Sequence, residues 1–247
     1  MALGFFTDIY YRLAMIAFCA QPRELSLNKK ASAIKCVVVP VTHYQQNCSV
    51  LICEATGKAA VVDPGGDLAR IVAVLQQHQL TLEKVFLTHA HMDHCAIADD
   101  IRQQFAVPIE GPHKDDQFWL DQLPQWCEKV GFPPAQVFSP DRWLQQGDTV
   151  SFGKQQLQVL HCPGHTPGHV VFYHAESQLA WVGDVLFKGS IGRTDFPRGN
   201  REDLLAAIKT KLWPLGDAVT FVPGHGPSST FGEERRSNPF VADKHYG

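Results

Sequence analysis

The chain has 247 residues, of which 45% are hydrophobic and 19% are charged, and its formal net charge at pH 7 is −3. This composition excludes a disordered chain, and the small negative charge excludes a general electrostatic attraction to nucleic acid or acidic lipid. The sequence contains no apolar run close to the roughly 20 residues of a membrane-spanning helix. We therefore expect a globular protein that binds neither nucleic acid nor membrane.

Residues 1–35 differ in composition from the rest of the chain and predict an N-terminal extension of open role. Their longest apolar run, Leu13 to Ala20, is compatible with a secretory signal or with an ordinary extension, and Met15 offers a second start position. The run is short and follows both Asp8 and Arg12, which favours the extension. The seven cysteines are odd in number and lack metal-binding spacing, which favours reduced thiols in a cytoplasmic protein.

Residues 36–247 are predicted to form one domain in which strands and helices alternate. Apolar and β-branched runs, helical spacing and turn residues predict, in chain order, strands over 36–41, 49–53 and 58–63, a helix over 68–79, a strand over 85–88, a helix over 96–105 and a strand over 107–110. The second half follows with a helix over 115–130 that Pro124 breaks, strands over 149–152, 157–161, 169–173 and 179–182, a helix over 201–211 and a strand over 219–222. This alternation is typical of an α/β fold.

The central motif is the string Thr-His-Ala-His-Met-Asp-His at residues 88–94, between a predicted strand and a predicted helix. A tight loop at a strand end projects its side chains into one small volume, and imidazole and carboxylate groups are ligands for zinc, iron or manganese. Because each metal site needs roughly four or five ligands counting solvent, one loop cannot complete two sites. Further ligands are therefore expected at other strand ends.

Three more candidates follow directly after predicted strands. His165 lies in the string CPGHTPGH at residues 162–169, Asp184 follows Gly183, and His225 lies in the string PGHG at residues 223–226. Glycines flank all three, which allows sharp turns and close backbone approach. Four such loops at four strand ends predict one shared rim that holds a metal centre.

In this order the motifs resemble the metallo-β-lactamase superfamily, specifically its glyoxalase II (hydroxyacylglutathione hydrolase) branch, over residues 37–240. The strings at residues 162–169 and 183–187 are typical of this branch, and those at residues 192–196 and 223–227 closely resemble its short bacterial proteins of the YcbL type. The resemblance implies a single-domain α/β (α+β) fold, the four-layer αββα sandwich. It also implies a thioesterase that converts S-D-lactoylglutathione to D-lactate and glutathione in methylglyoxal detoxification.

The resemblance further implies a centre of two divalent metal ions, with zinc expected and iron or manganese also permitted by the ligand types. It assigns His89, His91 and His165 to the first ion. It assigns Asp93, His94 and His225 to the second ion. Asp184 would bridge both ions, and a hydroxide between them would attack the thioester carbonyl. The resemblance implies that Asp93 and Asp184 are the catalytic residues.

Several neighbouring residues have open roles. Asp63 either caps the following Pro-Gly-Gly turn or supports a metal-binding imidazole. His161 is expected to pack or to form a hydrogen bond beside the ligand loop, and His169 to be structural. Arg193 and Lys188 are candidate contacts to glutathione carboxylates, which suit arginine forks.

The strongest rival function is a persulfide dioxygenase with one iron, which shares a Gly-Arg-Thr-Asp-Phe string like residues 192–196. The strings around Phe187 and Phe196 favour the thioesterase instead. Asp184 in place of a cysteine ligand disfavours the common β-lactamase type, and the net charge disfavours a nuclease. A complete set of seven ligand residues disfavours a non-catalytic metal-binding module.

Classical glyoxalase II also has a helical C-terminal domain, whereas this chain ends 22 residues after His225. Weaker selectivity for glutathione is therefore expected, and other small thioesters are candidate substrates.

Overall fold

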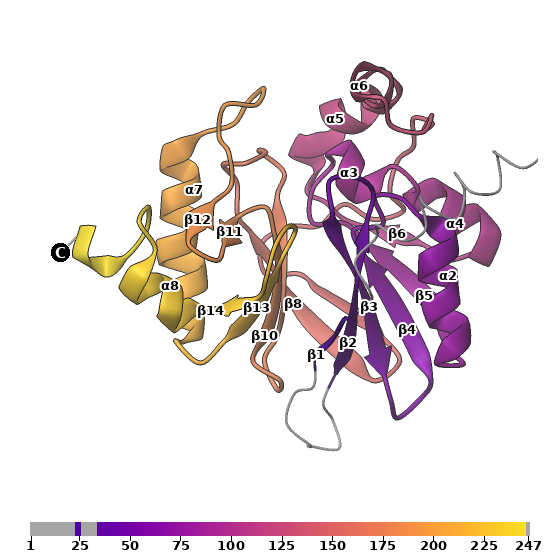
Figure 1. Cartoon of the computed structure of the whole chain (residues 1–247), viewed down its shortest axis with the longest axis horizontal. Coiled ribbons are helices and arrows are strands. Elements are labelled where there is room, and N and C mark those ends of the chain that lie inside the picture. The colour runs from indigo at the N-terminus through magenta and orange to yellow at the C-terminus, as the bar shows by residue number, and fades with distance from the viewer. Residues whose placement is uncertain (1–22, 26–33, 246–247) are drawn as a thin grey trace, which may run out of the picture.

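Two β-sheets stacked face to face form the centre of the molecule, and helices cover their outer faces (Figure 1). The computed structural model describes residues 23–25 and 34–245. Helices α2 (Leu68–Gln77) and α4 (Ala98–Phe105) lie beside the first sheet, and α7 (Arg201–Ala207) and α8 (Phe231–Ser237) lie beside the second. This order of helix, sheet, sheet and helix is the αββα sandwich that the family resemblance implies.

The first sheet has six strands in chain order. They are β1 (Arg23–Leu25), β2 (Lys35–Val41), β3 (Gln46–Cys53), β4 (Lys58–Val62), β5 (Thr81–Phe86) and β6 (Ile109–Glu110). Strands β1 to β4 pair antiparallel, whereas β4, β5 and β6 run parallel. Because parallel strands end at the same edge, the residues that follow β4 and β5 come together there.

Part of the predicted N-terminal extension belongs to this sheet. Arg23–Leu25 pair antiparallel with residues 36–38 of β2, because the edge of β2 offers unpaired backbone N–H and C=O groups. Residues 1–22 and 26–33, including the apolar run Leu13 to Ala20, lie outside the described residues. The domain boundary therefore stays a prediction.

The helix predicted over 96–105 is observed as α4, which begins at Ala98, and a separate short helix that the sequence did not predict, α3 (Met92–Cys95), precedes it. The break falls at Ile97, whose backbone N–H donates to the carbonyl of Pro64 at 3.3 Å. This contact with the turn after β4 follows the end of α3, just after the metal-ligand motif. The short helix α3 thus places Asp93 and His94 at the edge of the sheet where β4 and β5 end.

The second sheet also has six strands, in the order β14-β13-β10-β9-β8-β7. Their bounds are β7 (Thr149–Phe152), β8 (Gln155–His161), β9 (Val170–His174), β10 (Leu179–Gly183), β13 (Thr220–Pro223) and β14 (Ser229–Thr230). Strands β10 and β13 run parallel, so Asp184 and His225 follow strands that end at one edge. A small hairpin of β11 (Leu186–Phe187) and β12 (Ser190–Ile191) lies next to this edge.

The segment between the two sheets carries the helices predicted over 115–130. They are the 3₁₀ turn η1 (Lys114–Asp116), α5 (Gln117–Asp121) and α6 (Leu123–Val130). The interruption falls at Gln122, and Pro124 lies in the first turn of α6, where its missing N–H leaves no helical hydrogen bond unmade. In Figure 1, α5 and α6 lie next to α3 at the edge where the candidate ligands gather.

The remaining elements extend the second helical layer. The π-helix η2 (Ile208–Leu212) and the 3₁₀ turn η3 (Trp213–Leu215) continue α7, and the 3₁₀ turn η4 (Asp243–His245) follows α8. Among the described residues, no helix is long and apolar enough to cross a membrane.

An aromatic core between the sheets fixes their relative position. Phe86 of β5 packs against Phe172 of β9, with ring centroids 5.4 Å apart, and against Phe152 of β7. Helices bury the other face of each sheet, which explains why strands such as β2 and β9 are apolar without alternation. The core thus aligns the ends of the strands, and with them the loops that carry the polar motifs.

Candidate metal centre

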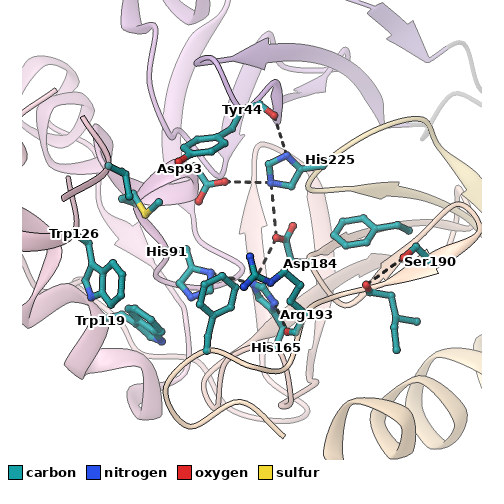
Figure 2. A pocket seen from close by; sticks show the side chains of 15 residues that line it. Tyr44, His91, Asp93, Trp119, Trp126, His165, Asp184, Ser190, Arg193 and His225 are labelled. Atoms are coloured by element: carbon teal, nitrogen blue, oxygen red, sulfur yellow. Dashed lines mark hydrogen bonds and ion pairs between the residues drawn. The ribbon is translucent and has the colours of Figure 1, made fainter. Parts of the chain in front are cut away.

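Seven histidine and aspartate side chains converge at the edge where β5, β8, β10 and β13 end. They are His89, His91, Asp93, His94, His165, Asp184 and His225. In Figure 2, His91, Asp93, His165, Asp184 and His225 lie around one small volume. The structure therefore brings together all the candidate ligands that the sequence singles out.

The first group consists of His89, His91 and His165, whose potential ligand atoms all lie within 4.8 Å of one another. Nδ1 of His91 is 3.0 Å from Nε2 of His165. Nδ1 of His165 lies 2.8 Å from the backbone carbonyl of Arg193, which can only accept, so this nitrogen carries the proton. Nε2 of His165 is then left with a lone pair directed at the other imidazoles, as a metal ligand requires.

The second group consists of Asp93, His94 and His225, again with potential ligand atoms within 4.8 Å. Nε2 of His225 lies 3.2 Å from Oδ2 of Asp93, while its Nδ1 lies 3.2 Å from the backbone carbonyl of Tyr44. As in His165, a backbone carbonyl holds the proton on the outer nitrogen, and the inner nitrogen faces the carboxylates.

Asp184 lies between the two groups. Its Oδ2 is 3.5 Å from Nε2 of His165, and its Oδ1 is 3.4 Å from Nε2 of His94. The backbone permits this approach because residue 224 is glycine: a Cβ there would collide with the Asp184 carboxylate and lie 2.6 Å from Cε1 of His94. One carboxylate is thus placed to serve both groups.

Of the two roles that the sequence allowed for Asp63, a turn cap or support of a metal-binding imidazole, the structure shows the second. Its Oδ2 lies 3.0 Å from Nδ1 of His94, and the same oxygen accepts from the hydroxyl of Thr88 at 2.6 Å. A carboxylate at this nitrogen fixes the ring so that Nε2 of His94 faces the centre. Asp63 also accepts from the backbone N–H of Thr88, which holds the ligand loop against the end of β4.

The two ligand groups differ in their electrostatics. Burial alone would lower the pKa of His94, but the carboxylates of Asp184, Asp93 and Asp63 outweigh it and raise that pKa to about 9. In the first group, burial and the neighbouring imidazoles hold the pKa values of His89 and His91 well below their ordinary range. The first group is therefore neutral, and the second group attracts a cation.

The donor set fits a pair of divalent metal ions. Among the described residues, Nε2 of His89, Nε2 of His94 and Oδ1 of Asp184 are buried without a hydrogen-bond partner. Each buried unpaired polar atom costs about 1–3 kcal/mol. Bound cations at these atoms remove that cost, and imidazole with carboxylate is a donor set that zinc, iron and manganese accept.

His169 has a role that the sequence did not reveal. The backbone N–H of Asp184 donates to Nε2 of His169 at 3.0 Å, and the His169 ring stacks on His89 with centroids 4.7 Å apart. His169 thus positions members of both halves of the centre. The sequence could not indicate this contact, because it joins the start of β9 to the loop after β10. His161 likewise contacts the ligand loop, through Nε2 and the carbonyl of Pro167 at 2.8 Å.

Asp116 is a second residue that the sequence missed. This fully buried carboxylate accepts from the backbone N–H of Ala90, from the hydroxyl of Thr166 and from the backbone N–H of Gly168, at 3.0, 2.8 and 2.6 Å. Burial raises its pKa to about 7, although the three donors oppose that shift. Asp116 therefore ties the loop that carries His89 and His91 to the loop that carries His165.

Asp116→Asn is expected to lower the free energy of unfolding by about 2 kcal/mol, and the melting temperature by about 4–8 °C. An amide has one acceptor oxygen, so at least one of the three donors would face an NH₂ group. Thermal unfolding measures the shift. Asp115→Asn is the matched control, because the side chain of Asp115 is 58% exposed. Equal melting temperatures for the two variants would contradict this role.

A cavity of about 550 Å³ opens over the centre. Five of the candidate ligands line it, together with Tyr44, Met92, Trp119, Trp126, Val130, Phe187, Ser190, Ile191, Arg193 and Phe196. The Arg193 side chain is 67% exposed and pairs with Asp195 through Nε and Nη2 at 2.9 and 2.8 Å. Lys188 is exposed and is not among the lining residues. Of the two predicted substrate contacts, only Arg193 therefore borders the cavity.

Comparisons with known proteins agree with this geometry. The family model described as the metallo-beta-lactamase superfamily matches residues 41–225, a range that contains all seven candidate ligands. A relative from Haemophilus influenzae named hydroxyacylglutathione hydrolase GloC is 44% identical over 208 residues, which make up 84% of this chain and 98% of that protein.

Two solved structures share the fold over nearly their whole length. The crystal structure of BLEG-1 B3 metallo-beta-lactamase matches with a TM-score of 0.77 at 35% identity, covering 85% of this chain and 99% of that chain. The crystal structure of TTHA1623 in a di-iron-bound form matches with a TM-score of 0.75 at 33% identity, covering 83% of this chain and 99% of that chain.

Proposed function

The chain belongs to the metallo-β-lactamase superfamily and is a metal-dependent hydrolase, and from this premise we propose that its substrate is a thioester, S-D-lactoylglutathione, which it converts to D-lactate and glutathione. The observation that carries the proposal is the convergence of two ligand groups on Asp184 at the floor of one cavity. The Haemophilus influenzae relative, which is named for this activity, supports the substrate. We further propose that the physiological role of the protein is the removal of methylglyoxal in the cytoplasm.

We assign the seven residues to two metal positions. His89, His91 and His165 would hold the first ion. Asp93, His94 and His225 would hold the second ion. Asp184 lies between the two groups and would serve both. Zinc is the metal expected from the ligand types, and iron is a second candidate because TTHA1623 binds two irons on the same fold.

When bound, two divalent ions at these positions lower the pKa of a water and polarise a carbonyl oxygen, so that hydroxide is available near neutral pH. Asp93 and Asp184 would accept hydrogen bonds from such a water, since their carboxylates lie beside the inner nitrogens of His225 and His94. The backbone carbonyls of Arg193 and Tyr44 keep the imidazoles of His165 and His225 in the tautomer that leaves the inner nitrogens unprotonated. Each of these contacts is in place before substrate arrives, which lowers the reorganisation that the reaction requires.

The leaving group requires little help from the protein. Attack on the thioester carbonyl forms a C–O bond and then breaks the C–S bond, which releases a thiolate and a carboxylic acid. The conjugate acid of a thiolate has a pKa of about 8.5, so it leaves without a strong protein acid. The open mouth of the cavity supplies the solvent that protonates it.

The test is the initial rate of S-D-lactoylglutathione hydrolysis by the purified protein loaded with zinc, iron or manganese. A rate that depends on the metal supports the proposal. A parallel assay measures oxygen uptake with glutathione persulfide, the substrate of the rival dioxygenase. Oxygen uptake without thioester hydrolysis by the iron-loaded protein would replace the proposed reaction by the dioxygenase.

Arg193→Ala is expected to raise KM for S-D-lactoylglutathione by about threefold to tenfold and to change kcat little. The guanidinium lies at the exposed mouth of the cavity, where contact with a glutathione carboxylate contributes equally to substrate and transition state. Steady-state kinetics measure both constants. Arg236→Ala is the matched control, because Arg236 is also 67% exposed and also pairs with a nearby carboxylate. An unchanged KM would remove Arg193 from the substrate site, and Lys188→Ala examines the other predicted contact.

A further inference from the structure

One side of the cavity over the candidate centre is lined only by apolar side chains, whereas the hairpin side combines the apolar Phe187 and Ile191 with Ser190. In Figure 2, Trp119 and Trp126 lie on one side of His91, and Ser190 lies on the opposite side. The side with the tryptophans is formed by five residues, which we call the apolar wall: Met92, Trp119, Trp126, Val130 and Phe196. They come from α3, α5, α6 and the segment after β12.

The apolar wall begins directly at the candidate metal ligands. The ring of His91 lies 4.5 Å from Trp119 and 4.7 Å from Phe196, measured between centroids. Trp126 continues the surface, with its ring 5.2 Å from that of Trp119. A substrate whose reacting carbonyl lies over the centre can therefore place one of its two substituents against this wall.

The charges identify which substituent that is. A glutathione moiety carries two carboxylates and an ammonium group, and burying such groups against apolar side chains without partners is strongly unfavourable. Besides the candidate ligands, Arg193 is the only charged residue that lines the described cavity, and its exposed guanidinium lies over the ring of Phe196 at 4.5 Å, whereas no charged lining residue lies over Trp119 or Trp126. Lys129 lies over the Trp126 ring at 4.4 Å but does not line the cavity. The thiol moiety therefore faces the mouth, and the acyl group faces the wall.

The wall is a poor match for a lactoyl group. A lactoyl group is small and carries a hydroxyl, which would lose its hydrogen bonds to water against the wall. An alkyl or aryl acyl group gains from the same surface, since each methylene removed from water tightens binding by about fourfold. Aromatic faces also accept flat or flexible apolar groups without a strict geometry.

We propose that the preferred substrates of this protein are thioesters of apolar acyl groups larger than lactoyl, with the acyl chain bound on the apolar wall. This inference rests on the proposed thioesterase function and specifies its substrate class. Lactoylglutathione then remains a substrate, but a weaker one than a thioester of the same thiol with a medium-length alkyl or aryl acyl group.

Binding can be measured separately from catalysis with two inert thioethers, S-methylglutathione and S-hexylglutathione. They share the thiol moiety and differ only in the length of the alkyl group. Calorimetric titration of the metal-loaded protein is expected to show a Kd at least about tenfold lower for the hexyl compound. Equal Kd values for the two compounds would overturn the inference.

Variants of the wall test where the hexyl group of the ligand binds. Trp126→Ala is expected to reduce the tenfold preference to within about threefold, whereas Trp143→Ala leaves it unchanged. Trp143 is a matched control, because it also packs, partly buried, against the same core cluster but does not line the cavity. If Trp126→Ala fails to fold, Val130→Thr places a hydroxyl on the wall at nearly constant shape. A hexyl preference that survives in the folded wall variant would overturn the assignment to this wall.

Hydrolysis rates separate this inference from the proposed function. The wild-type protein is expected to cleave hexanoylglutathione with a kcat/KM at least about tenfold above that for S-D-lactoylglutathione. Equal or reversed values would overturn the inference and leave the thioesterase function in place. Chain-length-dependent binding with no hydrolysis of either thioester would overturn the thioesterase function instead.

Discussion

Asp184→Asn is expected to lower kcat/KM for thioester hydrolysis by at least about a thousandfold, while the protein stays folded. Asp184 has one oxygen near His165 of the first ligand group and the other near His94 of the second. An asparagine of the same shape keeps one oxygen, but its NH₂ group cannot bind a metal ion. The variant therefore lacks one bridging ligand and loses the arrangement in which both ions act on one water.

Metal analysis and circular dichroism distinguish this mechanism from unfolding. The variant is expected to retain the wild-type spectrum, because the backbone N–H of Asp184 still donates to His169. Its metal content is expected to fall from two equivalents to one or fewer. Asp121→Asn is the control, since Asp121 is an exposed carboxylate at the end of α5. Near-wild-type activity of Asp184→Asn with two bound metals would refute the bridging role.

Removal of the metals is expected to reduce thioester hydrolysis to background and to lower the melting temperature by about 5–10 °C. A ligand present at a hundredfold above its Kd stabilises the folded state by about 2.7 kcal/mol. For a protein of this size, each kcal/mol corresponds to about 2–4 °C. The apoprotein also leaves buried imidazole and carboxylate atoms without partners, which adds to the loss.

The measurement compares melting curves and rates before chelation, after chelation and after addition of zinc, iron or manganese. Both the rate and the melting temperature are expected to return with at least one of these metals. In Asp184→Asn the shift on chelation should be smaller, because fewer ions are bound. A melting temperature that does not change on complete removal of metal would show that the cluster does not bind metal in the folded protein.

The motif at residues 88–94 illustrates what could be predicted locally. Its ligand types and its place after an apolar strand indicate a metal site without knowledge of the rest of the fold. His165, Asp184 and His225 could be added because each follows a strand and is next to glycine. These inferences depend only on residues close together in the sequence, and the family resemblance supplied the assignment of the ligands to two metal ions.

The supporting contacts could not be predicted in this way. Asp116 joins Ala90 to Gly168, and His169 joins its own loop to Asp184. The Asp116 contacts link a loop of the first sheet to a loop of the second, so they form only when the two sheets pack on the aromatic core. The His169 contact forms when the neighbouring strands β9 and β10 of the second sheet pair. Nothing in the local sequence distinguishes Asp116 from the exposed Asp115 beside it.

The sequence by itself determined the fold class, the strands and helices with strong periodicity, and the set of candidate ligands, because these depend on side-chain type and short-range spacing. The tertiary structure decided which imidazole nitrogen faces the centre, that Asp63 supports His94, and that Arg23–Leu25 join the first sheet. It also decided that an apolar wall borders the ligands. These features depend on distances between remote segments, which are fixed only by the packing of the four layers.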